Sequence, residues 1–119
     1  MSRIALVAVG LVAALALAAP IGATSSVTKL TGTVGPGFTI TLKKGTAKVK
    51  TLKAGKYKIT VSDKSNIHDF HLKGPGVNKM ITTTPFKGTK TVTVTLKKGK
   101  YTYICDPHAT VMKGSFTVK

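Results

Sequence analysis

The sequence contains one cysteine, no tryptophan, no glutamate and only three aspartates in 119 residues, and Arg3 is its only arginine. A single cysteine excludes an internal disulfide, so no disulfide bond stabilises the fold. No window shows the apolar stripe of an amphipathic helix. The 18 lysines are scattered, without arginine or interleaved aromatic residues, which argues against nucleic acid as a partner. The excess of positive charge favours acidic or anionic partners. The alternative is that most of the lysines only form a solvated, soluble surface.

The N-terminal segment has the order of a secretory signal. Arg3 precedes an uninterrupted apolar run over residues 4–19, and small residues follow. This order predicts export, with cleavage after Ala23 preferred to cleavage after Ala18. An uncleaved membrane anchor is the alternative, because a span needs about 20 apolar residues. We expect residues 1–23 to be a signal peptide and residues 24–119 to be the mature domain, in the periplasm, at the cell surface or outside the cell.

The mature chain of 96 residues is long enough for one small domain with a modest core. Apolar and polar residues alternate with period two at 37–43, 57–62, 89–98 and 115–119, and glycine-containing turns separate such segments. In the first of them, Phe38, Ile40 and Leu42 share the apolar phase. This pattern predicts half-buried strands, and we expect an all-β, two-sheet antiparallel sandwich of about eight strands with Greek-key connections.

Two segments resemble each other, LKAGKYKI from Leu52 and LKKGKYTY from Leu96. One interpretation makes them equivalent hairpins in the two halves of the sandwich. The other is that similar turns demand similar residues.

The stretch YTYICDPHATVMKG brings three unusual side chains together in the sequence. Cys105 shares its strand phase with Tyr101 and Tyr103 and should point into the sandwich, and a loop then carries His108 and Met112. A thiolate, imidazoles and a thioether are the ligands of a blue-copper site, in which two histidines and a cysteine surround the metal and a methionine is a weak axial ligand. Zinc also binds cysteine with histidines, but a thioether is a poor zinc ligand, so Met112 favours copper.

The site needs a second histidine, and SNIHDFHLKG supplies two candidates. His68 shares its phase with Phe70 and Leu72, which should face inward. His71 shares the outward phase of Asp69. Strand alternation therefore favours His68 over His71 as the ligand.

The region from Gly35 to Lys119 resembles a small bacterial cupredoxin of the plastocyanin, amicyanin and pseudoazurin group. YICDPHATVMKGSFTV is similar to the family's loop of cysteine, histidine and methionine with its closing strand, and NIHDFHLKGPGV is similar to its first-histidine segment. The resemblance implies a cupredoxin-like fold and one copper ion that alternates between Cu(I) and Cu(II). It implies His68, Cys105, His108 and Met112 as the metal ligands.

Three positions depart from the family's pattern. Three residues separate His108 from Met112, a spacing between the shorter amicyanin-like and the longer plastocyanin-like loops. Asp69 follows the first histidine where many relatives have asparagine, which places an acid beside the site. Ile104 stands where plastocyanin has a tyrosine, so a tyrosine exit route for electrons is not supported.

The function expected from these features is one-electron transfer by a protein that is not an enzyme. Its partner would be an acidic redox protein, with possible association with an anionic cell envelope, and the chain would act as a monomer. Copper binding and delivery without a redox partner is the alternative, although only Met80 and Met112 remain after export, whereas copper chaperones tend to be rich in methionine. A copper nitrite reductase or multicopper oxidase needs further histidines for another copper, and this chain has only three histidines. The last alternative is a surface adhesin or structural sandwich, in which the ligand pattern would be accidental.

Overall fold

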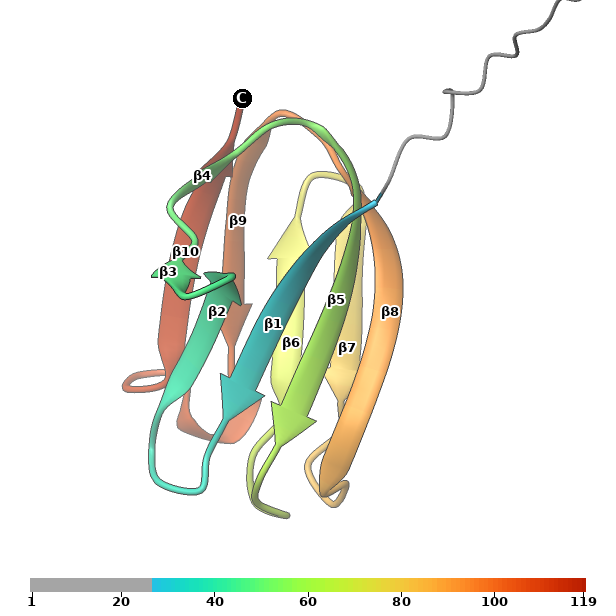
Figure 1. Cartoon of the computed structure of the whole chain (residues 1–119). Coiled ribbons are helices and arrows are strands. Elements are labelled where there is room, and N and C mark those ends of the chain that lie inside the picture. Colours follow the sequence, from blue (N-terminus) through green and yellow to red (C-terminus); the bar gives the residue numbers. More distant parts are fainter. Residues whose placement is uncertain (1–26) are drawn as a thin grey trace, which may run out of the picture.

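The computed structural model describes residues 27–119 as two five-stranded sheets packed face to face (Figure 1). The first sheet has the order β3 (Ala47–Lys48), β2 (Ile40–Lys44), β1 (Thr28–Val34), β5 (Gly55–Asp63) and β8 (Gly88–Leu96). The second has the order β4 (Thr51–Leu52), β10 (Lys113–Val118), β9 (Gly99–Ile104), β6 (Phe70–Gly74) and β7 (Val77–Thr82). The predicted all-β, two-sheet sandwich is confirmed. The ten strands exceed the predicted eight by β3 and β4, which are only two residues long.

The predictions of a signal peptide over residues 1–23 and of cleavage after Ala23 lie outside the described residues. Within residues 27–119, no helix is long and apolar enough to cross a membrane. Both complete sheets and the core between them lie within 28–118.

Most strand pairs are antiparallel, as expected, but β1 pairs with β5 in parallel, and so does β4 with β10. Parallel neighbours cannot be joined by a tight hairpin and need a longer crossover. Here β2, β3 and β4 intervene between β1 and β5 in the sequence, so the chain travels to the other sheet and back before the pair forms. Period-two alternation predicts which face of a strand is buried and carries no information about this direction.

The two similar segments are not hairpins. The first carries the chain from β4 in the second sheet to β5 in the first, and the other carries it from β8 back to β9 in the second sheet. At each crossing, a tyrosine hydroxyl forms a hydrogen bond with the backbone of the lysine four residues earlier. The Tyr57 hydroxyl donates to the Lys53 carbonyl, and the Tyr101 hydroxyl accepts from the Lys97 N–H. The repeated sequence therefore marks an equivalent corner between sheets.

The core is formed by the inward phases of the strands, as the alternation predicted. Its fully or nearly fully buried apolar side chains are Leu30, Val34, Leu42, Val49, Leu52, Tyr57, Ile59, Val61, Phe70, Leu72, Ile81, Leu96, Tyr101, Tyr103, Cys105, Met112, Phe116 and Val118. Two stacked aromatic pairs brace the second sheet. The rings of Phe70 and Tyr103 lie 5.7 Å apart, and those of Tyr101 and Phe116 lie 5.4 Å apart. Such pairs add about 0.5–1.5 kcal/mol to the stabilisation from burial alone.

Candidate metal centre

The predicted ligands come together at one end of the sandwich. His68 lies in the segment between β5 and β6, and Cys105, His108 and Met112 lie between β9 and β10. Because β5 ends, β6 begins, β9 ends and β10 begins at this end, the two segments meet there although they are 37 residues apart in sequence. We call it the metal end; it is the lower end of the sandwich in Figure 1.

Three potential donor atoms form a compact triangle. The Nδ1 atoms of His68 and His108 are 3.1 Å apart, and the Cys105 sulfur lies 3.7 Å from the first and 3.5 Å from the second. A point in the plane of these three atoms lies about 2.0 Å from each, within the range of metal–imidazole and metal–thiolate bonds (about 2.0–2.3 Å). His68 and Cys105 are fully buried and His108 is half-buried. The donor set therefore fits a single first-row metal ion with soft-ligand preference, and among such ions it suits copper.

The ligand loop is held in shape by its own backbone. Pro107 stands inside η2 (Asp106–His108), and the His108 N–H donates to the Cys105 carbonyl at 3.0 Å. The Met112 N–H then donates to the His108 carbonyl at 2.9 Å, and the Met112 carbonyl accepts from the Cys105 N–H at 3.0 Å. This closed loop brings Met112 back beside Cys105 and buries it completely. Its role as axial ligand stays a prediction.

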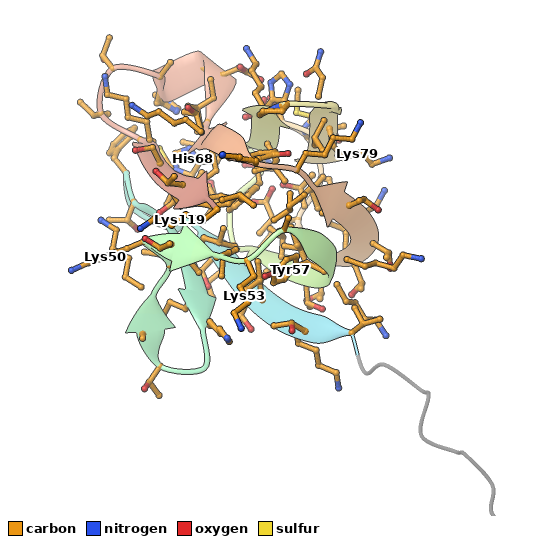
Figure 2. All side chains as sticks on the ribbon, turned by 90° about the horizontal axis from the view of Figure 1, so that it is seen from above. Lys50, Lys53, Tyr57, His68, Lys79 and Lys119 are labelled. Carbon is orange, nitrogen blue, oxygen red and sulfur yellow. The ribbon has the colours of Figure 1, made fainter. Side chains whose placement is uncertain are left out.

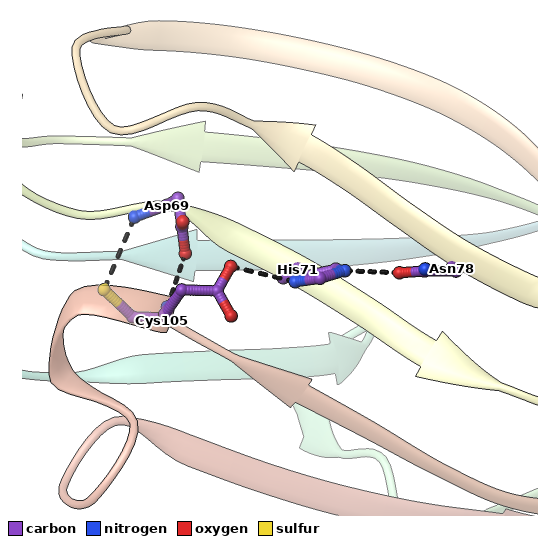
Figure 3. Close-up of polar contacts among 5 residues, drawn as sticks. Asp69, His71, Asn78 and Cys105 are labelled. Carbon is purple, nitrogen blue, oxygen red and sulfur yellow. Dashed lines mark hydrogen bonds and ion pairs between the residues drawn. The ribbon is translucent and has the colours of Figure 1, made fainter.

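The structure places His68, and not His71, beside Cys105 and His108. His68, Phe70 and Leu72 are all fully buried, so the phase assigned to them is correct. His71 is directed away from the donor triangle. Its Nδ1 lies 2.8 Å from Asp106 Oδ2, and its Nε2 contacts the side-chain oxygen of Asn78 (Figure 3). Both ring nitrogens of His71 thus face oxygen atoms, which leaves neither free for the metal.

The expected outward orientation of Asp69 is wrong. Only 3% of Asp69 is exposed, because it precedes β6 and the Cys105–Asp106 segment packs against it. Its backbone N–H donates to the Cys105 sulfur at 3.4 Å, and its Oδ1 accepts the Asp106 N–H at 2.7 Å (Figure 3). Asp69 therefore fixes Cys105 from the opposite segment. Burial raises the pKa of Asp69 to about 6, and the neighbouring charge of Asp106 adds to this effect.

Burial also raises the pKa of the Cys105 thiol above its ordinary value. The carboxylates of Asp69 and Asp106 raise it further, whereas the N–H groups of Asp69 and His108 lower it. Without metal, the thiol holds its proton at neutral pH. Since a metal binds the thiolate, binding at Cys105 must release that proton.

A ring from the β1–β2 segment closes the site, and sequence reasoning missed it. Phe38 was assigned to an inward strand phase, but it precedes β2 and is 59% exposed. Its ring packs edge-on against both imidazoles, at 5.5 Å from His68 and 4.9 Å from His108 between ring centroids. Gly35, with φ of 76°, allows this segment to approach, because a Cβ there would lie 3.0 Å from Cδ2 of His68. The sequence signal was the turn residues at 35–37, which end the strand before Phe38.

Comparison with known families matches residues 33–119 to the copper binding proteins of the plastocyanin/azurin family. No curated protein matches the chain. Among solved structures, variants of rusticyanin align with 27% identity over 80% of each chain at a TM-score of 0.53. Reduced rusticyanin aligns with 26% identity over 80% of this chain and 82% of its own, also at 0.53. Rusticyanin from Thiobacillus ferrooxidans aligns with 25% identity over 76% of each chain at 0.51.

The fold and the donor triangle define a small type 1 blue copper protein, with copper as its cofactor. The chain belongs to the plastocyanin/azurin family of copper-binding proteins.

Proposed function

We propose that this protein is a one-electron carrier whose single copper ion alternates between Cu(I) and Cu(II). The observation that carries the proposal is the triangle of Cys105 Sγ with the two histidine Nδ1 atoms, with its vertices 3.1–3.7 Å apart. When bound there, copper supplies reversible one-electron chemistry. The chain's own residues hold the donors at fixed positions, so that little rearrangement accompanies a change of oxidation state.

Each residue of the site has a distinct role in this proposal. Cys105 provides the strong thiolate bond, and His68 is the buried anchor. Met112 provides the weak axial contact. His108 is half-buried, and it is the edge through which electrons would leave. Phe38 shields both imidazoles from water, which lowers the local dielectric and limits loss of the metal.

A carrier is favoured over a copper-delivery protein by burial. His68, Cys105 and Met112 are each 0% exposed, whereas a protein that hands over copper needs ligands that a recipient can reach. An enzyme with a further copper is disfavoured too. Of the three histidines, two belong to the triangle and His71 is bound by Asp106 and Asn78.

The proposed partner is an acidic redox protein that docks at the metal end. Exposed apolar side chains surround the site there, with Phe38 before β2, Ile67 beside His68 and Val111 in the ligand loop. Lys64 and Lys113 are exposed at the same end and would meet acidic groups on such a partner. We further propose that the protein acts as a monomer after export, the export resting on the apolar segment 4–19.

The test is the visible spectrum and voltammetry of the mature domain with one equivalent of Cu(II). An intense blue thiolate-to-copper band and a reversible one-electron wave are expected, and Cys105→Ser should abolish both. A colourless one-to-one complex of the wild type would contradict the blue-copper proposal. A blue protein that passes copper rapidly to an apo acceptor and shows no reversible wave would favour delivery instead.

A further inference from the structure

The lysines are concentrated at the end of the sandwich opposite the metal centre. At this end, which we call the lysine end, β1 and β5 begin and β8 and β10 end (Figure 1). Nine exposed lysines lie there, namely Lys29, Lys44, Lys50, Lys53, Lys56, Lys97, Lys98, Lys100 and Lys119. The one ion pair within residues 27–119 joins His71 to Asp106, so none of these lysines forms an ion pair with a carboxylate.

The acidic residues are gathered at the metal end. Asp63 ends β5, Asp69 directly precedes β6, and Asp106 follows β9. The 18 lysines and three aspartates of residues 27–119 give a net charge of +15, which is therefore polarised along the strands with its unbalanced part at the lysine end. Like charges gathered at one end repel one another and destabilise the compact state, and a polyanionic partner would relieve the repulsion.

The lysine end is hollowed as well as charged. An open depression of about 750 Å³ is lined by Thr28, Tyr57 and residues of the β4–β5 corner, together with four lysines, Lys44, Lys53, Lys56 and Lys119. Figure 2 views the molecule from this end and labels three of the lining residues, Lys53, Tyr57 and Lys119. The shape can receive small anionic groups between separate ammonium ions.

The residue types favour phosphate headgroups over other anions. A lysine ammonium is a compact charge without the planar fork with which arginine recognises one defined partner, and residues 27–119 contain no arginine. Stacking of bases would need exposed aromatic rings, but Tyr57 is buried with its hydroxyl bound to the Lys53 carbonyl. The mode of binding that these residues support is therefore diffuse attraction to an array of negative charges.

The position of the N-terminal segment selects a bilayer among phosphate-bearing surfaces. The described chain begins at Val27 and enters β1 at Thr28, which also lines the depression. Residues 1–26 precede Val27, so before cleavage, or in an uncleaved chain, the apolar run over residues 4–19 is joined to the domain at its lysine end. The segment that directs the chain to a membrane would therefore bring this end toward the bilayer first.

We propose that the lysine end binds the anionic phospholipid headgroups of a bilayer and holds the metal end facing away from it. The binding does not depend on the proposed redox function, because it needs no copper. Its consequence is orientation, since a docked molecule presents His108 and Phe38 to soluble partners.

The experiment uses apo domain 24–119, which contains both complete sheets and excludes the apolar run. Sedimentation with vesicles of phosphatidylcholine, with and without 30% phosphatidylglycerol, measures binding at low salt. The wild type should bind only the anionic vesicles. Each lysine near such a surface contributes roughly fivefold in affinity. A lysine-end variant with Lys44, Lys53, Lys56 and Lys119 all changed to Gln should therefore bind about 100-fold or more weakly.

The matched control removes the same charge elsewhere. It changes Lys64, Lys87, Lys90 and Lys113 to Gln, at or near the metal end, and should lose less than about tenfold. Equal losses in the two variants would mean that only net charge matters, and they would overturn the proposal, as would a wild type that ignores anionic vesicles.

Two measurements on the wild type do not depend on any variant. Lysine acetylation followed by mass spectrometry should show Lys53 and Lys119 protected by anionic vesicles and Lys64 and Lys113 unprotected; the reverse pattern would refute the orientation. Soluble polyphosphate should compete only weakly at the same phosphate concentration. If it strips the protein from the vesicles completely, the ligand is a free phosphate polymer and the bilayer assignment is wrong.

Discussion

Replacing Gly35 by alanine should damage the metal centre without touching a ligand. Gly35 has φ of 76°, and an L residue in this left-handed region costs about 1–2 kcal/mol. The new Cβ would also lie 3.0 Å from Cδ2 of His68 and 3.2 Å from Cβ of Ser65. Displacing a fully buried ring in this way adds about 1–2 kcal/mol, as in other overpacked cores. We expect a total loss of about 2–4 kcal/mol in the free energy of unfolding.

Gly45→Ala is the matched control for this change. Gly45 has φ of 64°, so it carries the same backbone penalty, but nothing lies within 4 Å of the position that a Cβ would take there. The stability difference between the two variants therefore isolates the contact with His68. The thermal unfolding midpoint of the apo domain should fall by roughly 4–8 °C for each kcal/mol lost.

The copper spectrum gives the second readout. Gly35→Ala should shift or weaken the thiolate-to-copper band, because His68 supplies one of the three donor atoms, whereas Gly45→Ala should leave the band unchanged. If the two variants are equally stable and share one spectrum, the close approach of Gly35 to His68 does not constrain the site, and the reasoning fails.

The remaining predictions concern the histidine ligand, the buried aspartate and the surface charge. His71→Ala should leave the copper spectrum nearly intact while His68→Ala loses it; the opposite outcome would mean that the ligand assignment is wrong. Asp69→Asn should stabilise the apo domain at pH 7.5 by up to about 3 kcal/mol, at 1.36 kcal/mol per pKa unit. The pKa of this carboxyl rises from 3.8 to about 6 on folding, so its contribution to the free energy of unfolding is full below pH 3.8 and is lost as the pH rises through 6. Urea unfolding at pH 3.5 should show no gain, and an equal gain at both pH values would exclude charge as the cause. Electron exchange with an acidic partner should slow as salt rises, because the Debye length falls from about 10 Å at 0.1 M to about 3 Å at 1 M; a rate independent of salt in stopped flow would exclude steering.

The ligand pattern could be predicted because it depends on local order. Cys105 lies in phase with Tyr101 and Tyr103, and a strand's alternation fixes the direction of each side chain whatever the strand pairs with. The same rule selected His68 from its neighbours Phe70 and Leu72. One thiol, two imidazoles and one thioether then limited the choice of metal, because the ligand types are properties of the residues themselves.

Alternation failed just outside the strands. Asp69 was expected to face solvent, but it precedes β6 and is covered by the Cys105–Asp106 segment. Phe38 was expected to be inward, but it lies in a turn and covers the two histidines. Both outcomes depend on contacts between segments far apart in the chain, such as Asp69 with Cys105, which no local pattern specifies.

The sequence by itself determined the all-β class, the candidate ligands and the total charge. The tertiary structure decided where that charge lies. Lysines that are scattered along the chain, such as Lys29, Lys56, Lys98 and Lys119, gather at one end because strand direction alternates and brings their ends together, while all three aspartates meet at the other. The parallel pairing of β1 with β5 was decided in the same way, by the path the chain takes between the sheets. Local sequence fixes the face of each strand, whereas only the closed sandwich fixes which ends become neighbours.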